Sequence, residues 1–163
     1  MISLILVITL LLIPFHPGGL KAMEKVKTKN IARLVINIDK KQYIHNKPIW
    51  LTLTITNRSE NTINLSHSLP ERDFEFAGKD SNGVPLRLTV YGKNVKENLD
   101  DTGRARVKLE PNQTRSYKVE ISKMYNLTTP ATYFIQTTRP ILDENYKNRT
   151  ILSSNEITFS VTD

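Results

Sequence analysis

The side chains that most often carry out chemistry in proteins are few in this sequence, and they do not follow known catalytic or metal-binding patterns. Cysteine is absent, so no thiol nucleophile and no disulfide can form. The three histidines are His16, His45 and His67, and two histidines in or near predicted turns are a weak metal signal without a carboxylate motif. No serine stands in a Gly-x-Ser-x-Gly elbow. We therefore expect no enzyme, no bound metal and no cofactor.

Acidic residues occur in pairs on predicted loops, and carboxylates on loops are possible calcium ligands. Loop ends of a β-sandwich can bind calcium, and Asp100 and Asp101 together with Glu97 could contribute oxygen ligands. The alternative is that the pairs are solvated turn residues, which is the interpretation we favour. The pairs are Glu71 with Asp73, Asp100 with Asp101, and Asp143 with Glu144.

Aromatic side chains are the best binding candidates. Trp50 is the only tryptophan and is predicted to point to the polar face of its strand. An exposed indole there could stack on a sugar ring or anchor a protein partner. Tyr91 and Tyr146 lie on predicted loops and are weaker candidates. The alternative for Trp50 is that the basic N-terminal segment or a neighbouring loop covers it.

Short alternating patterns predict that strands position these residues. The clearest strand is Ile49–Asn57, where apolar residues alternate with Trp50 and three threonines, so that one face is buried. Asn82-Gly83 predicts a hairpin turn between two strands. With no long helical pattern, we expect an all-β, antiparallel immunoglobulin-like sandwich of about 7–9 strands. The other predicted strands are 33–39, 62–66, 74–80, 86–90, 104–109, 115–122, one that ends at Arg139, and 156–161, with long polar loops at 91–102 and 140–150.

The segment Leu127–Tyr133 is predicted to form a tyrosine corner, which ties a crossover between the two sheets. Leu127 would fill the core, Pro130 would turn the chain, and the Tyr133 hydroxyl would reach a main-chain group of the preceding loop. The alternative is a helix end at Ser122–Leu127, followed by an ordinary strand with a buried tyrosine.

The N-terminal residues indicate export. Ile2–Phe15 is an apolar run of signal-peptide length, and Ala22 is an acceptable last residue before cleavage. The expected organisation is a signal peptide at 1–22, a basic linker at 23–32 and one sandwich domain at 33–163, with no spanning membrane segment after cleavage. No lysine or arginine precedes the apolar run. The alternative is therefore a cytoplasmic protein that starts at Met23.

The formal net charge of +7 is concentrated near the N-terminus of the 163-residue chain. A basic protein can bind nucleic acid, anionic membranes or acidic glycans. Readers of nucleic acid usually interleave aromatic residues with arginines on one surface or carry a named motif, and neither is present. We therefore expect no nucleic-acid partner. Because cysteine is absent from an apparently exported domain, we expect a bacterial source.

Four segments resemble bacterial immunoglobulin-like modules. The resemblance covers about Arg33–Asp163 and implies a β-sandwich, although Asn112 and Ala131 stand where these modules usually have glycine. Fibronectin type III-like domains and bacterial intracellular proteinase inhibitors are similar, so the resemblance implies no particular function or functional residue. The segments are Tyr43–Ser59, Asp80-Ser81-Asn82-Gly83, Leu109-Glu110-Pro111-Asn112 and Pro130-Ala131-Thr132-Tyr133.

Three functional hypotheses follow. The first is a secreted or periplasmic, non-catalytic module that binds a protein or glycan partner through loops or an exposed sheet face. The second is a protease inhibitor that presents the loop at Tyr91–Thr102 or at Pro140–Thr150. The third is an accessory domain of an enzyme whose catalytic part lies on another chain. An exposed Trp50 in an apolar patch would favour the first, and a loop braced by hydrogen bonds would favour the second.

Overall fold

The computed structural model describes residues 31–97 and 105–163. The expected signal peptide at 1–22, most of the linker at 23–32, and Asp100 and Asp101 lie outside the described residues. The elements are β1 (Ala32–Ile38), β2 (Gln42–Ile44), β3 (Trp50–Asn57), β4 (Ile63–His67), α1 (Pro70–Asp73), β5 (Glu75–Asp80), α2 (Val90–Glu97), β6 (Ala105–Leu109), β7 (Thr114–Glu120), α3 (Ile121–Met124), β8 (Ala131–Leu142), β9 (Arg149–Ser153) and β10 (Ile157–Thr162).

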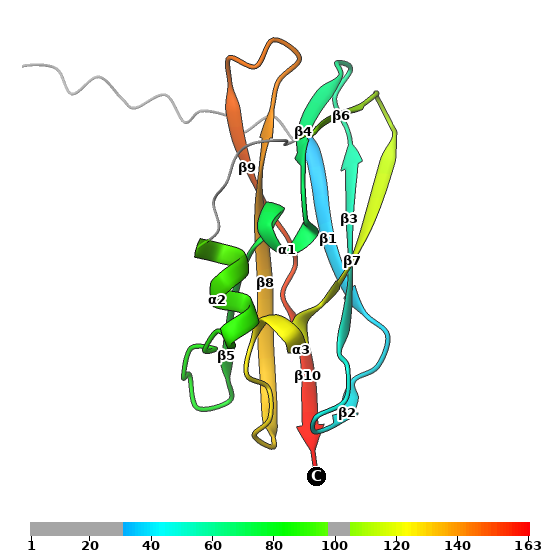
Figure 1. Ribbon diagram of the computed structural model, residues 1–163. Helices are drawn as coiled ribbons and strands as arrows, with labels where there is room; N and C mark the ends of the chain where they lie inside the picture. Colours follow the sequence, from blue (N-terminus) through cyan, green and yellow to red (C-terminus); the bar gives the residue numbers. More distant parts are fainter. Residues whose placement is uncertain (1–30, 98–104) are drawn as a thin grey trace, which may run out of the picture.

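Two sheets run along the length of the molecule and face each other (Figure 1). One is the antiparallel sheet β1-β3-β7, and the other has the order β2-β10-β8-β4-β6, with β5 and β9 also paired to β8. The 12-residue strand β8 is the central strand of the second sheet, because it pairs with four strands: β10, β5, β4 and β9. The predicted all-β sandwich is confirmed. One pairing differs from the antiparallel expectation, since β2 runs parallel to β10.

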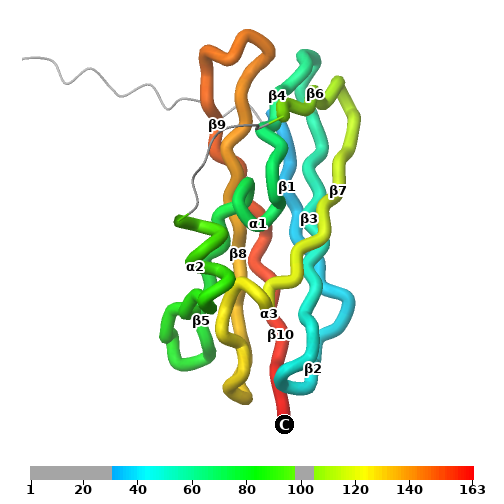
Figure 2. The backbone as a smooth tube through the Cα atoms, in the orientation of Figure 1, coloured from blue at the N-terminus to red at the C-terminus, as the bar shows by residue number. Residues whose placement is uncertain are grey.

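The core lies between the two sheets and follows the alternation seen in the sequence. In β3 the side chains of Leu51, Leu53 and Ile55 are fully buried, as a strand with one covered face requires. The last strand, β10, contributes Phe159 and Val161 from the opposite sheet. The tube in Figure 2 shows the three helices gathered along one side of this sandwich rather than spread around it. The helices therefore give that side a surface different from the rest of the domain.

The segment after the Asn82-Gly83 turn differs from the prediction. Of the two turn residues Asn82 and Gly83, only Gly83 has a positive φ. The Asp80 carboxylate closes the turn by accepting hydrogen bonds from the main-chain N–H groups of Asn82 and Val84 at 2.8 and 2.9 Å. The predicted partner strand 86–90 does not form. β5 pairs with β8 along one edge, and the returning chain follows its other edge briefly, with a bridge between Lys79 and Pro85 and a hydrogen bond of 3.0 Å from the Leu86 N–H group to the Gly78 carbonyl oxygen. Val90, predicted to belong to the partner strand, is 77 % exposed at the start of α2. A local turn signal predicts the reversal of the chain but not how far the returning segment stays paired.

Both predicted long loops are shorter than expected. Residues 91–97 of the first belong to the helix α2, which begins at Val90. In the second, β8 continues through Pro140 to Leu142 and pairs with β9, so only residues 143–148 remain as a turn. A proline normally argues against a strand interior because it lacks an N–H group. Here the register with β9 pairs Pro140 with Ile151 and extends the strand past the proline.

Candidate interaction surface

Lys123 in α3 forms a surface ion pair with the end of β7. Its Nζ atom lies 2.8 Å from Oε2 of Glu120, the last residue of β7. The pKa of Lys123 is raised, first by this hydrogen bond and then by the charge of Glu120, with smaller long-range contributions from Tyr91 in α2 and Glu71 in α1. The ion pair therefore joins α3 to β7, and α1 and α2 lie within electrostatic range of it.

Trp50 lies next to this ion pair. It is the direct antiparallel partner of Glu120 across β3 and β7, and the two side chains share the outer face of the sheet. The indole is 45 % exposed. We call Trp50, Glu71, Tyr91, Glu120 and Lys123 the α3 surface. It unites two of the three aromatic binding candidates found in the sequence.

Tyr91 was predicted on a loop, and this is wrong, because it lies in the first turn of α2. Thr89 begins the helix by accepting a hydrogen bond from the Gly92 N–H group on its Oγ1 atom at 3.0 Å. The Thr89 N–H group in turn donates to the Met124 carbonyl oxygen at 3.0 Å. A Cβ atom on Gly92 would stand 2.2 Å from that same oxygen, so only glycine allows α2 to approach α3 this closely. The ring of Tyr91 is thus presented from a fixed helix.

Tyr125 anchors the other end of α3. Its hydroxyl donates a hydrogen bond of 2.9 Å to the main-chain oxygen of Phe76 in β5. Burial, helped by the negative charge of Glu75, raises the pKa of this hydroxyl to about 12, so it stays protonated as a donor at neutral pH. α3 is therefore tied to the second sheet as well as to β7, and the α3 surface rests on rigid supports.

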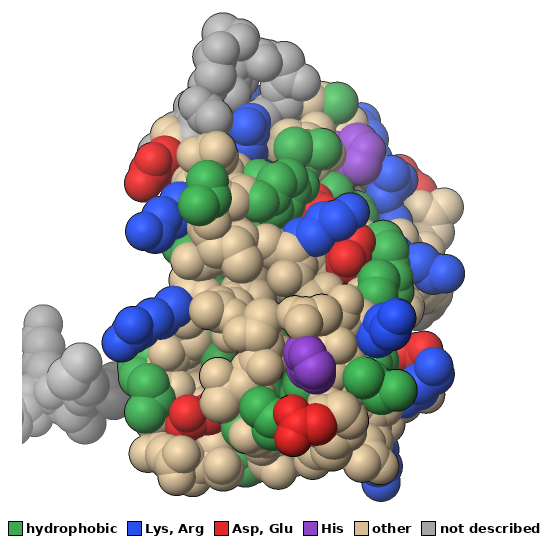
Figure 3. All heavy atoms as spheres, turned by 60° about the horizontal axis from the view of Figure 1, so that its bottom comes forward, with side chains coloured by type: hydrophobic (Ala, Val, Ile, Leu, Met, Phe, Trp, Pro, Cys, Tyr) green, Lys and Arg blue, Asp and Glu red, His purple; other side chains and the backbone are tan. Residues whose placement is uncertain are grey.

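A small hollow opens beside the α3 surface. Its volume is about 260 Å³, and its walls include Lys47, Glu120 and Ser122. Figure 3 turns the lower end of Figure 1 forward and shows uncharged polar side chains and backbone across its centre, with Lys and Arg toward the margins. The hollow is smaller than the cavities that usually enclose small organic ligands. The region therefore fits surface contact better than the capture of a small molecule.

Tyr146 lies apart from the α3 surface, in the turn between β8 and β9. Its hydroxyl donates to Oδ1 of Asn64 at 3.1 Å, and the guanidinium of Arg106 lies 4.4 Å from the ring centroid. The residue takes a φ of 59°, which is unusual for a bulky side chain. These contacts hold the ring over the buried Asn64, so a structural role explains most of its environment.

The three residues of the predicted tyrosine corner lie at the entry to β8. The Tyr133 hydroxyl donates a hydrogen bond of 2.6 Å to the main-chain oxygen of Thr129, four residues earlier. Leu127 and the Tyr133 ring are buried, and Pro130 is exposed between them. Burial raises the pKa of Tyr133, with a smaller contribution from Asp80.

The role of Tyr133 as a corner is tested by its conversion to phenylalanine. We expect Tyr133→Phe to lower the free energy of unfolding by about 1–2 kcal/mol, because the Thr129 carbonyl oxygen loses its donor while the ring stays in place. Urea unfolding followed by circular dichroism measures the change. The matched control is Tyr91→Phe, whose hydroxyl lies on the surface and whose removal should change stability by less than about 0.5 kcal/mol. Equal effects of the two variants would contradict a specific tie at Tyr133.

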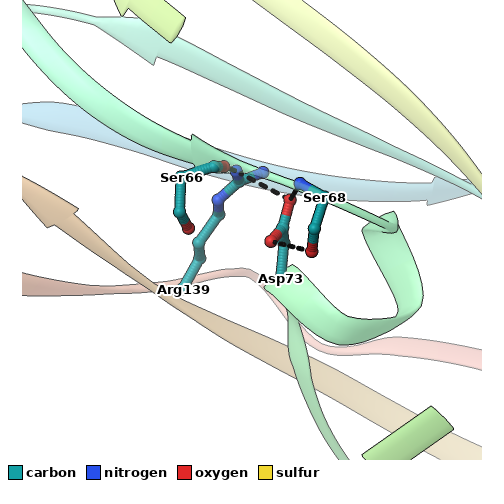
Figure 4. Close-up of polar contacts among 4 residues, drawn as sticks. All are labelled: Ser66, Ser68, Asp73 and Arg139. Carbon is teal, nitrogen blue, oxygen red and sulfur yellow. Dashed lines mark hydrogen bonds and ion pairs between the residues drawn. The ribbon is translucent and has the colours of Figure 1, made fainter. Parts of the chain in front are cut away.

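A buried ion pair that the sequence did not reveal lies between the sheets and α1. Arg139 of β8 is fully buried, and its Nη2 atom lies 3.4 Å from Oδ2 of Asp73 and donates to the Ser66 carbonyl oxygen (Figure 4). Ser68 supports Asp73 with two hydrogen bonds of 3.0 Å, one from its N–H group and one from its hydroxyl. Asp73 was predicted to be a solvated loop carboxylate, and this is wrong, because its side chain is buried and paired with Arg139. The pair fixes α1, which carries Glu71 to the α3 surface.

Other chemistry-bearing residues do not converge in the described part of the chain. No group of three or more His, Cys, Asp or Glu residues there is arranged to hold a metal ion. His45 lies in the turn after β2, and His67 ends β4 with its ring beside Tyr117. Across residues 31–97 and 105–163, no helix is both long and apolar enough to span a membrane.

The fold and the surface can now be compared with known proteins. A family model described as "Flagellar collar protein C, N-terminal domain" matches residues 35–162. The chain therefore belongs to the flagellar collar protein C N-terminal domain family. The description of this family is that of a structural module and names no reaction. No curated protein matches the chain.

Solved structures resemble the chain only distantly. The X-ray structure of the structural genomics target SoR45 is 14 % identical with a TM-score of 0.49, and the match covers 81 % of this chain and 88 % of that one. A CARDB domain from Pyrococcus furiosus, solved with di-metal ions, is 13 % identical with a TM-score of 0.39, covering 80 % and 87 %. The ASH/PapD-like domain of human CEP192 is 10 % identical with a TM-score of 0.36, covering 91 % and 94 %.

Proposed function

We propose that this chain is an exported, non-catalytic module of a flagellar collar, and that it docks a protein partner through the α3 surface. The observation that carries the proposal is that the exposed Trp50 lies directly opposite Glu120, which is paired with Lys123, while the exposed Tyr91 stands on the neighbouring helix α2. Exposed aromatic residues beside a charged pair on rigid elements are the usual composition of an interface hot spot. Membership of the collar family supports the assembly, and the apolar run Ile2–Phe15 supports export.

The composition of the surface favours a protein partner over a glycan. Sugar binding relies on an aromatic platform next to several planar polar side chains that reach the sugar hydroxyl groups. Glu120, which lies directly opposite Trp50, is already bound to Lys123. A glycan remains the alternative ligand for Trp50, and it predicts binding of soluble saccharides that Trp50→Ala abolishes.

Replacement of Trp50 tests the proposal. We expect Trp50→Ala to weaken binding to a collar component by about 2 kcal/mol or more, or about thirtyfold, because an anchoring indole is removed from the centre of the interface. The binding partner is first identified by crosslinking of the tagged full chain in cells, and its affinity is then measured by titration calorimetry. The matched control is Tyr146→Ala, which removes a similarly exposed aromatic ring from the other end of the domain.

The proposal is contradicted if Trp50→Ala binds the partner with the same affinity as wild type while Tyr146→Ala binds it more weakly. That result would place the docking site at the opposite end of the sandwich. Export is checked separately, by fractionation and N-terminal sequencing of the protein expressed from Met1. A chain that stays in the cytoplasm and starts at Met1 or Met23 would contradict the extracytoplasmic part of the proposal.

Protease inhibition is the second candidate, and one observation favours it. The turn at 143–148 is braced, because Asp143 accepts hydrogen bonds from the Lys147 N–H group and the Asn148 side chain at 2.8 and 2.7 Å. The turn is compact, however, and its Tyr146 folds back onto Asn64. Proteases bind their peptides in extended form, which this turn does not offer. Inhibition of any protease in a standard panel at stoichiometric concentration would reverse this ranking.

A further inference from the structure

The sheet β1-β3-β7 has two edges, and the hydrogen-bond pattern identifies which groups face each edge. At the two ends of the β3–β7 ladder, Asn57 N–H donates to the Gln113 carbonyl oxygen at 3.0 Å, and Ile121 N–H donates to that of Ile49 at 2.9 Å. Hydrogen-bonded pairs recur at every second residue of an antiparallel ladder. Odd-numbered residues of β7 therefore bond to β3, and the even-numbered ones turn their main-chain groups to the outer edge.

The outer edge of β1 is closed by a side chain. Oδ1 of Asn155, between β9 and β10, accepts a hydrogen bond from the Ile36 N–H group at 3.0 Å. Its Nδ2 atom donates to the Ile36 carbonyl oxygen at the same distance. The Asn155 amide thus takes the place that the main chain of a neighbouring strand would occupy. A strand from another protein cannot pair there without displacing it.

The outer edge of β7 has no comparable closure among the described residues. β7 is paired with β3 alone, and the register runs without a bulge from Thr56↔Thr114 to Trp50↔Glu120. The main-chain groups of Thr114, Ser116 and Lys118 face outward, and none of them is hydrogen-bonded to a described residue beyond β3. Their side chains are small or flexible and are exposed. A regular edge strand of this kind is a template for strand addition.

Charge and position indicate the kind of strand that would fit. β6, the edge of the other sheet, follows the same side of the sandwich as β7 in Figures 1 and 2. Together these strands carry Arg106, Lys108, Arg115 and Lys118, and Glu120 is the only acidic residue within them. That residue is bound to Lys123. An added strand with acidic side chains would therefore meet complementary charge.

We propose that the free edge of β7 is a docking site for an extended, acidic segment of a partner protein, which adds to the sheet as a fourth strand beside β7. The inference goes beyond the α3 surface but rests on the proposed role as an interaction module. β7 ends at Glu120, which belongs to the α3 surface, so a partner bound there can continue along the edge. Main-chain hydrogen bonds to residues 114, 116 and 118 would provide affinity, and the cations would provide specificity.

The test uses a fluorescein-labelled synthetic peptide that alternates valine and glutamate, with the full chain as receptor and anisotropy as readout. We expect saturable binding and, in hydrogen-exchange NMR, new protection of the Ser116 and Lys118 amides. Ser116→Pro should reduce affinity at least about tenfold, because it removes an outward N–H group without removing a β3 ladder bond. Ser116→Ala is the matched control, since it loses the same hydroxyl and keeps the N–H group, and it should bind like wild type.

Two further variants test the role of charge. Lys118→Glu should lower the affinity for the peptide, whereas Lys93→Glu, which makes the same charge change on α2, should leave it unchanged. Because Ser116→Pro could unfold the domain, the peptide is also N-methylated at every second amide, which blocks strand pairing from the ligand side. Loss of binding by the methylated peptide supports the proposal. Binding that survives methylation, or no binding of the parent peptide at its solubility limit, overturns it.

Docking through the α3 surface and strand addition at the β7 edge can be tested independently of each other. Trp50→Ala should leave the affinity for the alternating peptide unchanged, because the indole lies on the outer face of β3 and not on the edge of β7. If Trp50→Ala abolished binding of the collar partner and the alternating peptide did not bind the β7 edge, the proposed function would stand and the strand-addition site would be rejected.

Discussion

Replacing Arg139 by methionine is expected to lower the free energy of unfolding by about 3–5 kcal/mol, the largest effect of any single substitution proposed for this protein. The guanidinium is fully buried against the rings of Phe74 and Tyr117, 4.4 and 4.8 Å from their centroids. Its removal leaves the Asp73 carboxylate buried without its cation. The cost arises from this uncompensated charge and from the loss of the cation that contacts both rings.

A double variant separates the ion pair from simple packing. In Arg139→Met with Asp73→Leu, both charges are gone, and we expect most of the lost stability to return, because a buried pair replaced by apolar side chains is often neutral. Chemical denaturation of wild type, both single variants and the double variant gives the coupling energy directly. A double variant as unstable as the sum of the two single variants would show that the pair itself contributes little.

Asn57→Ala is expected to cost about 2–4 kcal/mol, because one fully buried amide serves both sheets. Its Nδ2 atom donates to the carbonyl oxygens of Leu109 in β6 and Asn61, both at 2.8 Å. Its Oδ1 atom accepts hydrogen bonds from the N–H and hydroxyl groups of Ser59 at 2.9 and 2.8 Å. The alanine variant leaves the buried Leu109 carbonyl oxygen without this donor, whereas the Asn61 carbonyl oxygen keeps a hydrogen bond from the Ser59 hydroxyl.

Thermal and urea unfolding measure the effect of Asn57→Ala against Ser59→Ala. The control removes the bonds of the Ser59 hydroxyl to Asn57 and to the main chain of Asn61, which lie in the exposed turn, and keeps the bond of the Asn57 amide to Leu109 in β6, so it should cost less than about 1 kcal/mol. If Asn57→Ala were as mild as Ser59→Ala, the tie from β3 to β6 would contribute little to stability. The Asn-Arg-Ser sequence that resembles bacterial immunoglobulin-like modules thus has a physical explanation in this domain: it closes a turn and joins the two sheets.

The sandwich and most of its core could be predicted from the sequence. Alternation with a period of two is a local property, and it assigned the buried faces of β3 and β10 correctly, because each strand has one face toward the opposite sheet. The exposure of Trp50 followed from the same alternation. These features needed no knowledge of which strands become neighbours.

Tertiary structure decided everything that depends on distant partners. Arg139 reads as an ordinary end of a strand, and only the approach of α1 and Ser66 makes its burial possible. The sequence around Tyr91 is typical of a polar loop, and the helix that carries it packs against α3 through Thr89 and Gly92, both of which lie at the Met124 carbonyl oxygen. Which sheet edge is closed and which stays open was likewise decided by Asn155, 119 residues from its partner Ile36. A single sequence records the residue types for such contacts, but the free energy that selects them comes from packing between segments that are far apart in the chain.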